Sequence, residues 1–425
     1  MRFVLASYGT RGDIEPCIAI GRALMRRGHD VRVAVPKNLV GFAEAAGLEA
    51  VAYGSDARDI LTDDFLRDFR RNLRRSFWTI LEPIRLLREL WAPWLRQWPE
   101  MSEALTSVTE GADLLFTGLV YQELALNVAE HYDIPLVAMH YFPIRSYGQL
   151  LPGVPSWLAR VGMRIYDWML WRMSKKAEDA QRRELGLSKT ARPGPRRITE
   201  RGSLEIQAYD EICFPGLAAE WTDWNRQRPF IGALTMGLTT DADDEIASWI
   251  AAGTPPICFG FGSMPVTKSP ADTIAVISAA CAQLGQRALI CSGWADFADI
   301  PCSDHVKVVK AANYAKVFPA CRAVVYHGGS GTTGAVMRAG IPAVILWTAG
   351  DQPYWGAQLK RLKVGTGRPF SSTTQETLVA DLREILRPEY AVNARELAAQ
   401  MSNATDSVAK AVDLIEDFAR LRSFA

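Results

Sequence analysis

A short apolar run followed at once by a cluster of glycines is the feature that most restricts the fold of this chain. Residues 323–326 (Ala-Val-Val-Tyr) have the length and composition of a buried parallel strand, and residues 327–334 (His-Gly-Gly-Ser-Gly-Thr-Thr-Gly) follow directly. Thr332 and Thr333 then stand as caps of a helix that runs through 336–338. This order predicts an anion site, because glycines let backbone N–H groups approach a phosphate and the helix dipole adds positive potential.

Polar side chains surround this predicted site. His327 and Ser330 carry donors within the glycine loop, and a second apolar run at 343–346 precedes Asp351 and Gln352. Phosphate ligands followed by a carboxylate and an amide suit a sugar carried on a diphosphate. The last two residues can instead be the N-cap pair of a helix, and both roles stay open at this stage.

The same alternation of apolar runs and helical segments recurs along the rest of the chain. Further strands are expected at 3–6, 31–35, 114–116, 136–139, 256–261, 288–291 and 306–309. The segment 16–27 is expected to form a helix with Pro16 near its first turn. Such α/β alternation implies parallel sheets with helices on both faces, and 425 residues suffice for two domains of about 200 each.

A second motif stands at the N-terminus. Residues 9–16 (Gly-Thr-Arg-Gly-Asp-Ile-Glu-Pro) follow the first predicted strand, so Asp13 is expected at the carboxyl edge of the sheet, where ligands bind. A carboxylate there can accept the proton of a hydroxyl nucleophile, with a pKa raised by burial. Asp13 can also cap the following helix, and Arg11 either organises the loop or faces phosphates; both questions stay open.

Together the two motifs resemble the family 1 glycosyltransferases. In that family a His-x-Gly-x-x-Ser/Thr loop holds the diphosphate of a nucleotide-sugar, and an Asp-Gln pair binds sugar hydroxyls. The residues that match this pattern are His327, Gly329, Thr332, Asp351 and Gln352. Residues 9–16 are similar to the Gly-Ser-Arg-Gly-Asp-Val-x-Pro opening of bacterial antibiotic and fungal sterol glycosyltransferases. The chain also resembles mycobacterial enzymes that glycosylate lipopeptides and related cell-wall lipids.

The resemblance implies the GT-B fold, in which two Rossmann-like domains face a cleft. The acceptor-binding domain is expected at 1–215, a linker at 216–231 and the nucleotide-sugar-binding domain at 232–401. The final segment, 402–425, is expected to form a helix that returns to the first domain.

The implied reaction is an inverting transfer, with Asp13 as the general base. A hexose or deoxyhexose would move from UDP or dTDP to a hydroxyl of a hydrophobic acceptor such as a lipid, lipopeptide, sterol or polyketide-like molecule. Ser263 resembles the family's Gly-Ser turn on the diphosphate, although a turn alone also explains it. Trp294 is a candidate cover for the base, whose identity stays open between uracil and thymine. The other predicted donor contacts are Gly12, Ser330 and Gly331.

No metal and no cofactor besides the co-substrate are predicted. Asp241 and Asp243 form an Asp-x-Asp pair, but they stand among further acids in a polar segment typical of a solvated helix start. The net charge of +1 gives no electrostatic reason to expect nucleic acid. Seven cysteines without a Cys-x-x-Cys pair, and a first apolar run too short for a signal peptide, favour a cytoplasmic protein with reduced thiols.

Two aromatic-rich segments, 65–98 and 157–173, interrupt the alternation. Three interpretations stay open: helices that cover the core, walls of an acceptor pocket, or a shallow peripheral contact with the inner face of a membrane. No run of about 18 uncharged apolar residues suggests a membrane span.

Other protein classes fit the sequence less well. The spacing of glycines at 9–12 departs from the Gly-x-Gly-x-x-Gly of dehydrogenases. A nucleotide-sugar epimerase or a non-catalytic auxiliary protein on the same fold remains an alternative. An auxiliary protein would keep its function when Asp13 is replaced by Asn, whereas a transferase would not.

Overall fold

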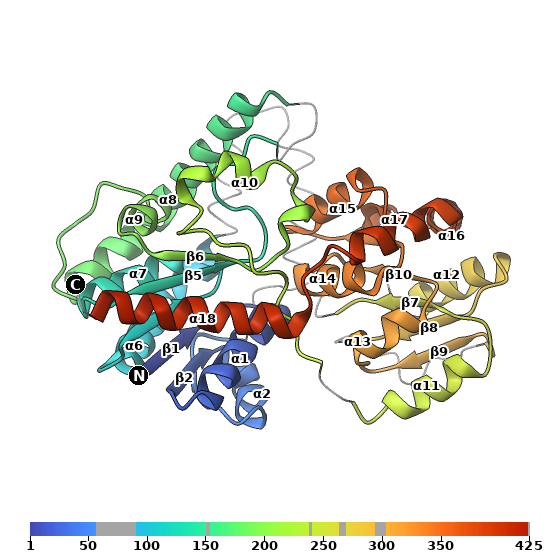
Figure 1. The fold of residues 1–425 in the computed structure, drawn as a ribbon, viewed down its shortest axis with the longest axis horizontal. Helices are drawn as coiled ribbons and strands as arrows, with labels where there is room; N and C mark the ends of the chain where they lie inside the picture. Colours follow the sequence, from blue (N-terminus) through green and yellow to red (C-terminus); the bar gives the residue numbers. More distant parts are fainter. Residues whose placement is uncertain (57–90, 150–153, 238–239, 263–268, 294–302, 424–425) are drawn as a thin grey trace. The chain divides into compact units, whose positions relative to one another are not determined.

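Two sheets with the same strand order organise the chain (Figure 1). The computed structural model describes residues 1–56, 91–149, 154–237, 240–262, 269–293 and 303–423. The chain divides into two compact units. Unit 1 consists of Met1–Glu211, Pro215–Leu234 and Ala404–Ala425, and unit 2 of Ile212–Phe214 and Thr235–Asn403.

The sheet of unit 1 is wholly parallel, with the order β3-β2-β1-β4-β5-β6. Its strands are β1 (Arg2–Ala6), β2 (Asp30–Val35), β3 (Glu49–Ala52), β4 (Leu114–Thr117), β5 (Leu136–His140) and β6 (Leu204–Gln207). Its principal helices are α1 (Arg11–Arg26), α2 (Val40–Ala45), α6 (Trp98–Thr109), α7 (Gln122–His131), α8 (Ser156–Glu184), α9 (Gly194–Glu200) and α18 (Ala404–Ser423). Every residue of β4, β5 and β6 is buried, as expected of parallel strands covered on both faces.

The sheet of unit 2 is also wholly parallel, with the order β12-β11-β10-β7-β8-β9. Its strands are β7 (Ile257–Gly260), β8 (Ala288–Cys291), β9 (Val306–Val309), β10 (Ala323–Tyr326), β11 (Ala343–Trp347) and β12 (Gly365–Pro369). The helices around it include α11 (Asp243–Ala251), α12 (Pro270–Gln283), α13 (Tyr314–Val317), α14 (Ser330–Ala339), α15 (Gln352–Arg361), α16 (Gln375–Ile385) and α17 (Pro388–Ala398). The prediction of two parallel-sheet α/β domains is confirmed.

Both predicted motifs lie where the strand order of their sheet reverses. In unit 1 the reversal falls between β1 and β4, and in unit 2 between β7 and β10. Residues 9–13 follow β1, and residues 327–329 follow β10. Ligands of open α/β sheets bind beside the carboxyl ends of the strands at this reversal, so the topology alone marks both loops as candidate sites.

Helix α1 begins five residues earlier than the position of Pro16 predicted. Thr10 is its N-cap, and Pro16 lies inside the helix. The prediction was wrong because it placed proline in the first turn, whereas a capping box starts the helix upstream. Proline lacks the N–H that would bond to the carbonyl of Gly12, which is the local cost of this arrangement.

The segment 216–231, predicted as a linker, belongs to unit 1. Its backbone adds to the edge of the sheet: Gln207 N–H donates to the Pro229 carbonyl over 2.9 Å, and Ile231 N–H donates to the Gln207 carbonyl over 3.0 Å. The final helix α18 packs beside α1 in the same unit (Figure 1), where its Glu416 carboxylate lies 2.8 Å from His29 Nε2.

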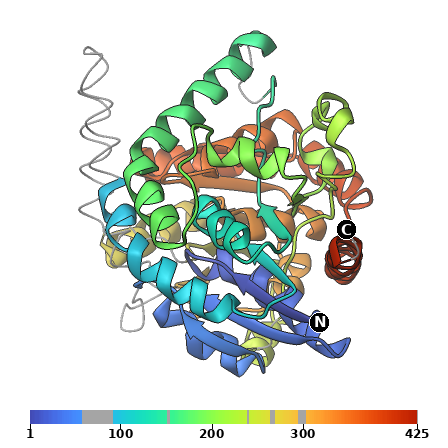
Figure 2. The same ribbon diagram turned by 90° about the vertical axis from the view of Figure 1, so that its left-hand side faces the viewer.

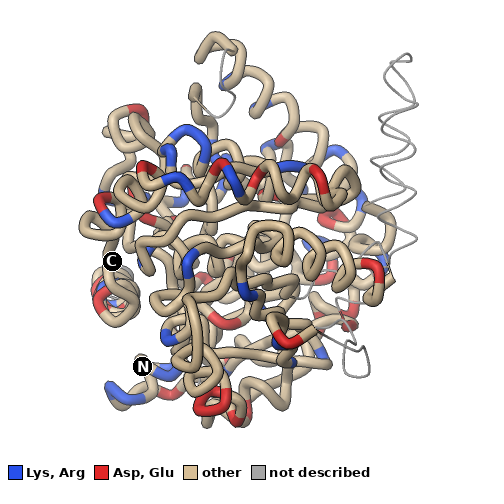
Figure 3. The backbone as a smooth tube through the Cα atoms, turned by 90° about the vertical axis from the view of Figure 1, so that its right-hand side faces the viewer, with Lys and Arg blue, Asp and Glu red and all other residues tan. Residues whose placement is uncertain are grey.

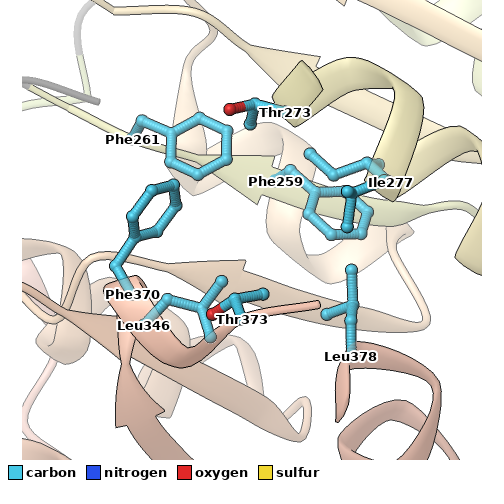
Figure 4. Close-up of a pocket in the computed structure, with 9 residues that line it drawn as sticks. Phe259, Phe261, Thr273, Ile277, Leu346, Phe370, Thr373 and Leu378 are labelled. Atoms are coloured by element: carbon cyan, nitrogen blue, oxygen red, sulfur yellow. The ribbon is translucent and has the colours of Figure 1, made fainter. Parts of the chain in front are cut away.

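A small apolar cavity of about 20 Å³ lies inside unit 2 (Figure 4). Phe259, Phe261 and Ile277 lie on one side of it, and Leu346 and Phe370 on the other. Most of these side chains belong to the hydrophobic core between the sheet, α12 and α16. We interpret the cavity as a packing gap of the core, because its lining offers too few polar partners to hold a water molecule.

Candidate active site

The loop after β10 forms a helix N-terminus with open backbone donors. Gly329 is the N-cap of α14, and its carbonyl accepts from Thr333 N–H over 2.9 Å. The amides of Ser330, Gly331 and Thr332 precede the first intrahelical donor and therefore have no helical acceptor. Together with the helix dipole, these three amides make the site suitable for a phosphate group.

Thr333 has a different role from the cap predicted for it. Its hydroxyl is buried, accepts from Tyr326 Oη over 2.9 Å and donates to the Gly329 carbonyl over 2.9 Å. This pair ties the loop to the strand before it. Thr332 is only partly buried at the helix start.

The imidazole of His327 lies between two glycines. A Cβ atom at Gly262 would stand 2.6 Å from His327 Cε1, and one at Gly329 would stand 2.6 Å from Nε2. Only glycine fits at either position without displacing the ring. Burial lowers the pKa of His327 to about 4, so the ring is neutral at pH 7 and offers one N–H donor.

The Asp351–Gln352 pair lies beside the same loop. Gly328 adopts φ +92°, and a Cβ atom there would lie 3.1 Å from Gln352 Cβ. Gln352 Oε1 accepts from Thr348 N–H over 2.7 Å, which fixes the turn after β11, while its amide nitrogen has no partner among the described residues. Asp351 is the N-cap residue of α15, and its carboxylate accepts from Trp355 Nε1 over 3.1 Å. Asp351 thus stands at the N-cap position of α15 without a side-chain capping bond, and contact of Asp351 or Gln352 with a sugar stays a prediction.

Replacement of Gly328 by Ala is expected to distort this loop. The positive φ and a methyl group 2.7 Å from Ile345 Cγ2 both oppose the substitution, so we expect a loss of roughly 1–3 kcal/mol of stability. Thermal unfolding measures it. Gly331→Ala is the matched control, because a Cβ there meets nothing within 4 Å and Ala favours the helix. Equal melting temperatures for the two variants would contradict the described loop.

Two predicted donor residues lie outside the described residues, namely Ser263 and Trp294. The loops that precede them are described. A Cβ atom at Gly293 would lie 2.1 Å from the Gly262 carbonyl oxygen, so the loops after β7 and β8 touch. Sequence reasoning missed this contact, for which the positive-φ glycines Gly262 and Gly293 are the only local signal.

In unit 1, Asp13 occupies the third position of α1 and closes its N-terminus. Its Oδ2 accepts from Thr10 N–H over 2.7 Å and from Thr10 Oγ1 over 3.1 Å. Gly9 makes room for the carboxylate, since a Cβ there would lie 2.3 Å from Oδ2. Burial raises the pKa of Asp13 to about 6, and the bonds from Thr10 oppose that rise. The capping role is therefore present, and the raised pKa leaves the carboxylate a stronger base than an ordinary aspartate.

The backbone of Asp13 is held from two directions. Its carbonyl accepts from Ser7 Oγ over 2.9 Å and from Tyr141 Oη over 2.7 Å. Tyr141 follows β5 and Ser7 follows β1, so two strand ends fix the position of the carboxylate. Neither residue was predicted, because Tyr141 is 128 positions away in the sequence.

The neighbours of Asp13 in the motif are more exposed. Gly12 lies in the first turn of α1 beside Asp13. The Arg11 guanidinium lies 4.9 Å from the Phe42 ring, and its Nε is 3.8 Å from the Glu15 carboxylate. Arg11 thus has partners within its own unit.

The Asp241–Asp243 pair sits at the start of α11. Asp243 Oδ1 accepts from Thr240 Oγ1 over 2.6 Å, a contact of the helix start, and from Asn313 N–H over 3.3 Å, which links α11 to the start of α13. Within the described ranges, no group of three or more His, Cys, Asp or Glu side chains is placed to hold a metal. Metal independence stays a prediction.

The aromatic segments have different environments. Most of 65–98 lies outside the described residues, but Trp94 and Trp98 pack against Tyr121 in the core of unit 1. The segment 157–173 lies within α8. Trp171 is buried there, whereas Trp157 and Trp168 are exposed, so core packing explains only part of this helix. Among the helices described, none is long and apolar enough to cross a membrane.

The two ends of the chain match known domains. Residues 3–104 match the glycosyltransferase family 28 N-terminal domain, and residues 291–416 match the C-terminal domain of the erythromycin biosynthesis protein CIII-like group. A glycosyltransferase of Mycobacterium tuberculosis is 59% identical over 423 residues, which cover 99% of each chain.

More distant relatives carry more specific names. A sterol 3-beta-glucosyltransferase of Arabidopsis thaliana is 27% identical over 97% of this chain and 67% of its own. Glycosyltransferase GtfE of Amycolatopsis orientalis is 28% identical over 98% of this chain and 97% of its own.

Solved structures share the fold at low sequence identity. The calicheamicin glycosyltransferase CalG4 aligns with a TM-score of 0.69 and 15% identity, over 98% of both chains. The spinosyn rhamnosyltransferase SpnG, complexed with thymidine diphosphate, aligns with a TM-score of 0.67 and 16% identity, over 97% of this chain and 100% of its own.

Proposed function

The chain belongs to the GT-B glycosyltransferases, and we propose that it transfers a hexose or deoxyhexose from a UDP- or dTDP-sugar to a hydroxyl group of a hydrophobic acceptor. One observation carries the proposal. The loop 327–329 holds the neutral ring of His327 against Gly329, leads into the open amides of α14, and passes so close to Gln352 that a Cβ at Gly328 would lie 3.1 Å from Gln352 Cβ. Phosphate donors and a sugar-binding amide side by side are what a nucleotide-sugar requires.

The donor half of the reaction follows from these groups. The amides of Ser330, Gly331 and Thr332 would hold the diphosphate, and His327 would add one N–H. Negative charge grows on the diphosphate as its bond to the anomeric carbon breaks, so donors fixed in advance stabilise the transition state more than the ground state. Gln352 and Asp351 would hold the sugar hydroxyls and orient the anomeric carbon.

The acceptor half needs a base. The acceptor oxygen would attack the anomeric carbon, its proton would pass to Asp13, and the nucleoside diphosphate would leave from the opposite side. This single displacement inverts the anomeric configuration. The raised pKa of Asp13 supports the role, because a carboxylate with a pKa of about 6 binds a proton more tightly than an ordinary one and is still ionised at pH 7.

The relatives narrow the choice of substrates. SpnG was solved with thymidine diphosphate, which supports a dTDP-sugar, and the sterol glucosyltransferase supports an acceptor with a large apolar face. We propose that neither a metal nor a further cofactor takes part, since the helix N-terminus and His327 already supply donors for the diphosphate.

Thermal melts with nucleotides test the donor site. UDP or dTDP at about 100 times its Kd is expected to stabilise the chain by roughly 2.7 kcal/mol, with the same shift in EDTA. GDP, NAD and a nucleoside monophosphate serve as comparison ligands. A shift with NAD alone, or no shift with any nucleoside diphosphate, would contradict the proposal. A shift that EDTA abolishes would contradict metal independence.

His327→Ala is the variant that links the shift to the site. It is expected to remove most of the nucleotide-dependent shift, while His305→Ala, a change outside the predicted site, should keep it. The melting temperatures of both variants without nucleotide show whether each variant folds.

A further inference from the structure

The first half of α8 presents an apolar face to solvent. The helix has 29 residues and is thus about 44 Å long. Its second half packs against α6 and α7, where Gln181 bonds with Trp98 and Asn127, and its residues Trp171, Ser174 and Glu178 are buried. Its first half extends away from the sheet of unit 1 (Figure 2) and contains one buried residue, Ala159.

The exposed side chains of this half are unusually large and apolar. Trp157 is 63% exposed, Ile165 53% and Trp168 52%. With Leu158, Val161 and Tyr166, they make up six of the eleven large hydrophobic side chains exposed among the described residues. Such a concentration marks an interaction surface rather than the scattered exposure common to all proteins.

Helical spacing places the apolar residues on one outward stripe. Trp157, Val161, Ile165 and Trp168 are related by i, i+4, i+8 and i+11, which is one face of a helix. Ala159 and Trp171 belong to the inner face. An ordinary surface helix turns its apolar stripe to the core, whereas this one also has an apolar stripe toward solvent.

The charges on this stretch have one dominant sign. Between residues 156 and 176 stand five basic residues and one acidic residue, Asp167. The basic residues are Arg160, Arg164, Arg172, Lys175 and Lys176. Arg160 pairs with Glu220 over 3.0 Å and Lys175 pairs with Asp179, which leaves Arg164, Arg172 and Lys176 to meet an external anion. Lys and Arg recur along this part of the chain in Figure 3. The Arg172 guanidinium lies 6.0 Å from the Trp168 ring, a distance typical of cation–π pairs.

We propose that the face formed by Trp157, Val161, Ile165 and Trp168 docks on an anionic lipid surface. Tryptophan and tyrosine with neighbouring arginines is the composition of helices that lie in a membrane interface, where the rings enter the headgroup region and the cations meet lipid phosphates. Charge complementarity favours this occupant over a second copy of the chain, because a symmetric pair would bring the basic residues together. The inference is independent of the proposed reaction.

Vesicle flotation tests the proposal. In the flotation gradient, the chain is expected to rise with vesicles of equal parts phosphatidylglycerol and phosphatidylcholine. Far less of the chain should rise with pure phosphatidylcholine vesicles. About 0.5 M NaCl should reduce binding to the anionic vesicles, because it screens the arginines. The triple variant Trp157→Ser, Ile165→Ser, Trp168→Ser should bind at least about tenfold more weakly.

A matched control keeps the test specific. Val392→Ser with Arg395→Glu alters an exposed valine and an arginine on α17 in unit 2 and should bind like the unaltered chain. A preserved nucleotide-dependent melt shift shows that a variant is folded, and it reports on the proposed function separately. Equal binding to both vesicle types, binding by the triple variant at full strength, or light scattering that shows dimers formed through this face would overturn the proposal.

Discussion

Replacement of Asp13 by Asn is expected to lower kcat by about 10²- to 10⁴-fold while the chain stays folded. Asn keeps an oxygen that can accept from Thr10 N–H, so the capping contact at 2.7 Å survives, but the amide cannot take a proton from the acceptor hydroxyl. Transfer assays with saturating donor and acceptor measure the loss. The nucleotide-dependent melt shift should remain, because the predicted phosphate ligands lie in unit 2.

The pH dependence identifies the group. Activity of the unaltered enzyme is expected to rise with pH through an apparent pKa of about 6 and then level off, because Asp13 must be ionised to act as a base. The residual activity of the Asn variant should not show this rise with pH. A rise at the same pH in the variant would show that another group takes the proton.

Stability gives a second, independent readout of the same pKa. Burial raises the pKa of Asp13 above its value in the unfolded chain, so the folded state binds the proton more tightly between the two values. Stability due to this group is therefore present below about pH 4 and is lost as the pH rises through about 6. Because Asn carries no charge, the melting temperature of the variant at pH 7.5 should be no lower than that of the unaltered chain. Any gain in melting temperature should vanish near pH 4.

Glu15→Gln is the matched control for this experiment. Glu15 lies two residues further along α1, is also partly buried, and makes a long ion pair of 3.8 Å with Arg11. We expect it to retain nearly full activity and the rise in activity near pH 6. If Asp13→Asn were as active as Glu15→Gln, Asp13 would be a capping residue only.

Much of the donor site follows from the sequence because backbone chemistry restricts it. Gly328 needs a positive φ and lies against Ile345, so the loop after β10 tolerates few other residues and leaves a visible pattern. Buried strands likewise leave a visible pattern, because their burial requires apolar residues. The strands that sequence reasoning missed, β3, β6 and β12, are all at sheet edges. Edge strands need less apolar sequence, as Gly-Thr-Gly-Arg-Pro in β12 illustrates.

The direction in which side chains point, and the contacts between residues distant in sequence, are harder to predict. The aromatic residues of α8 have helical spacing, and this spacing shows that a stripe exists but not which way it points. Trp171 faces the core, whereas Trp168, only three residues earlier, faces solvent. Pairing between distant residues is equally hidden, because Tyr141 reaches the Asp13 carbonyl only after the sheet has formed.

The buried charge cluster around Glu205 is a further feature that the sequence conceals. Glu205 is fully buried on β6, and its carboxylate accepts from Arg145 Nε over 2.5 Å and from Arg228 Nε over 3.2 Å. Thr199 Oγ1 donates to it over 2.9 Å. Burial opposes the charge, but the two arginines and His140 outweigh it and lower the pKa of Glu205 to about 2. The cluster joins the loop after β5 to the segment 216–231, which explains why that segment belongs to unit 1.

Replacement of Glu205 by Gln is expected to destabilise unit 1 by about 3–5 kcal/mol, because two buried guanidinium groups lose their counter-charge. For a unit of this size the melting temperature should fall by roughly 10 °C. Calorimetry measures it. Glu200→Gln is the matched control: Glu200 also contacts two arginines, Arg192 and Arg196, but on the surface, so its loss should leave the melting temperature nearly unchanged.

At acidic pH, the melting temperatures of the unaltered chain and the Glu205→Gln variant should become equal. The depressed pKa of Glu205 means that its stabilising effect is present above about pH 4.5 and is lost as the pH falls toward about 2. The two melting curves should therefore converge on acidification. A constant difference down to the lowest pH at which the chain folds would mean that the shape of the side chain, and not its charge, holds Arg145 and Arg228 in place. A melting temperature equal to that of Glu200→Gln at pH 7 would contradict the buried cluster itself.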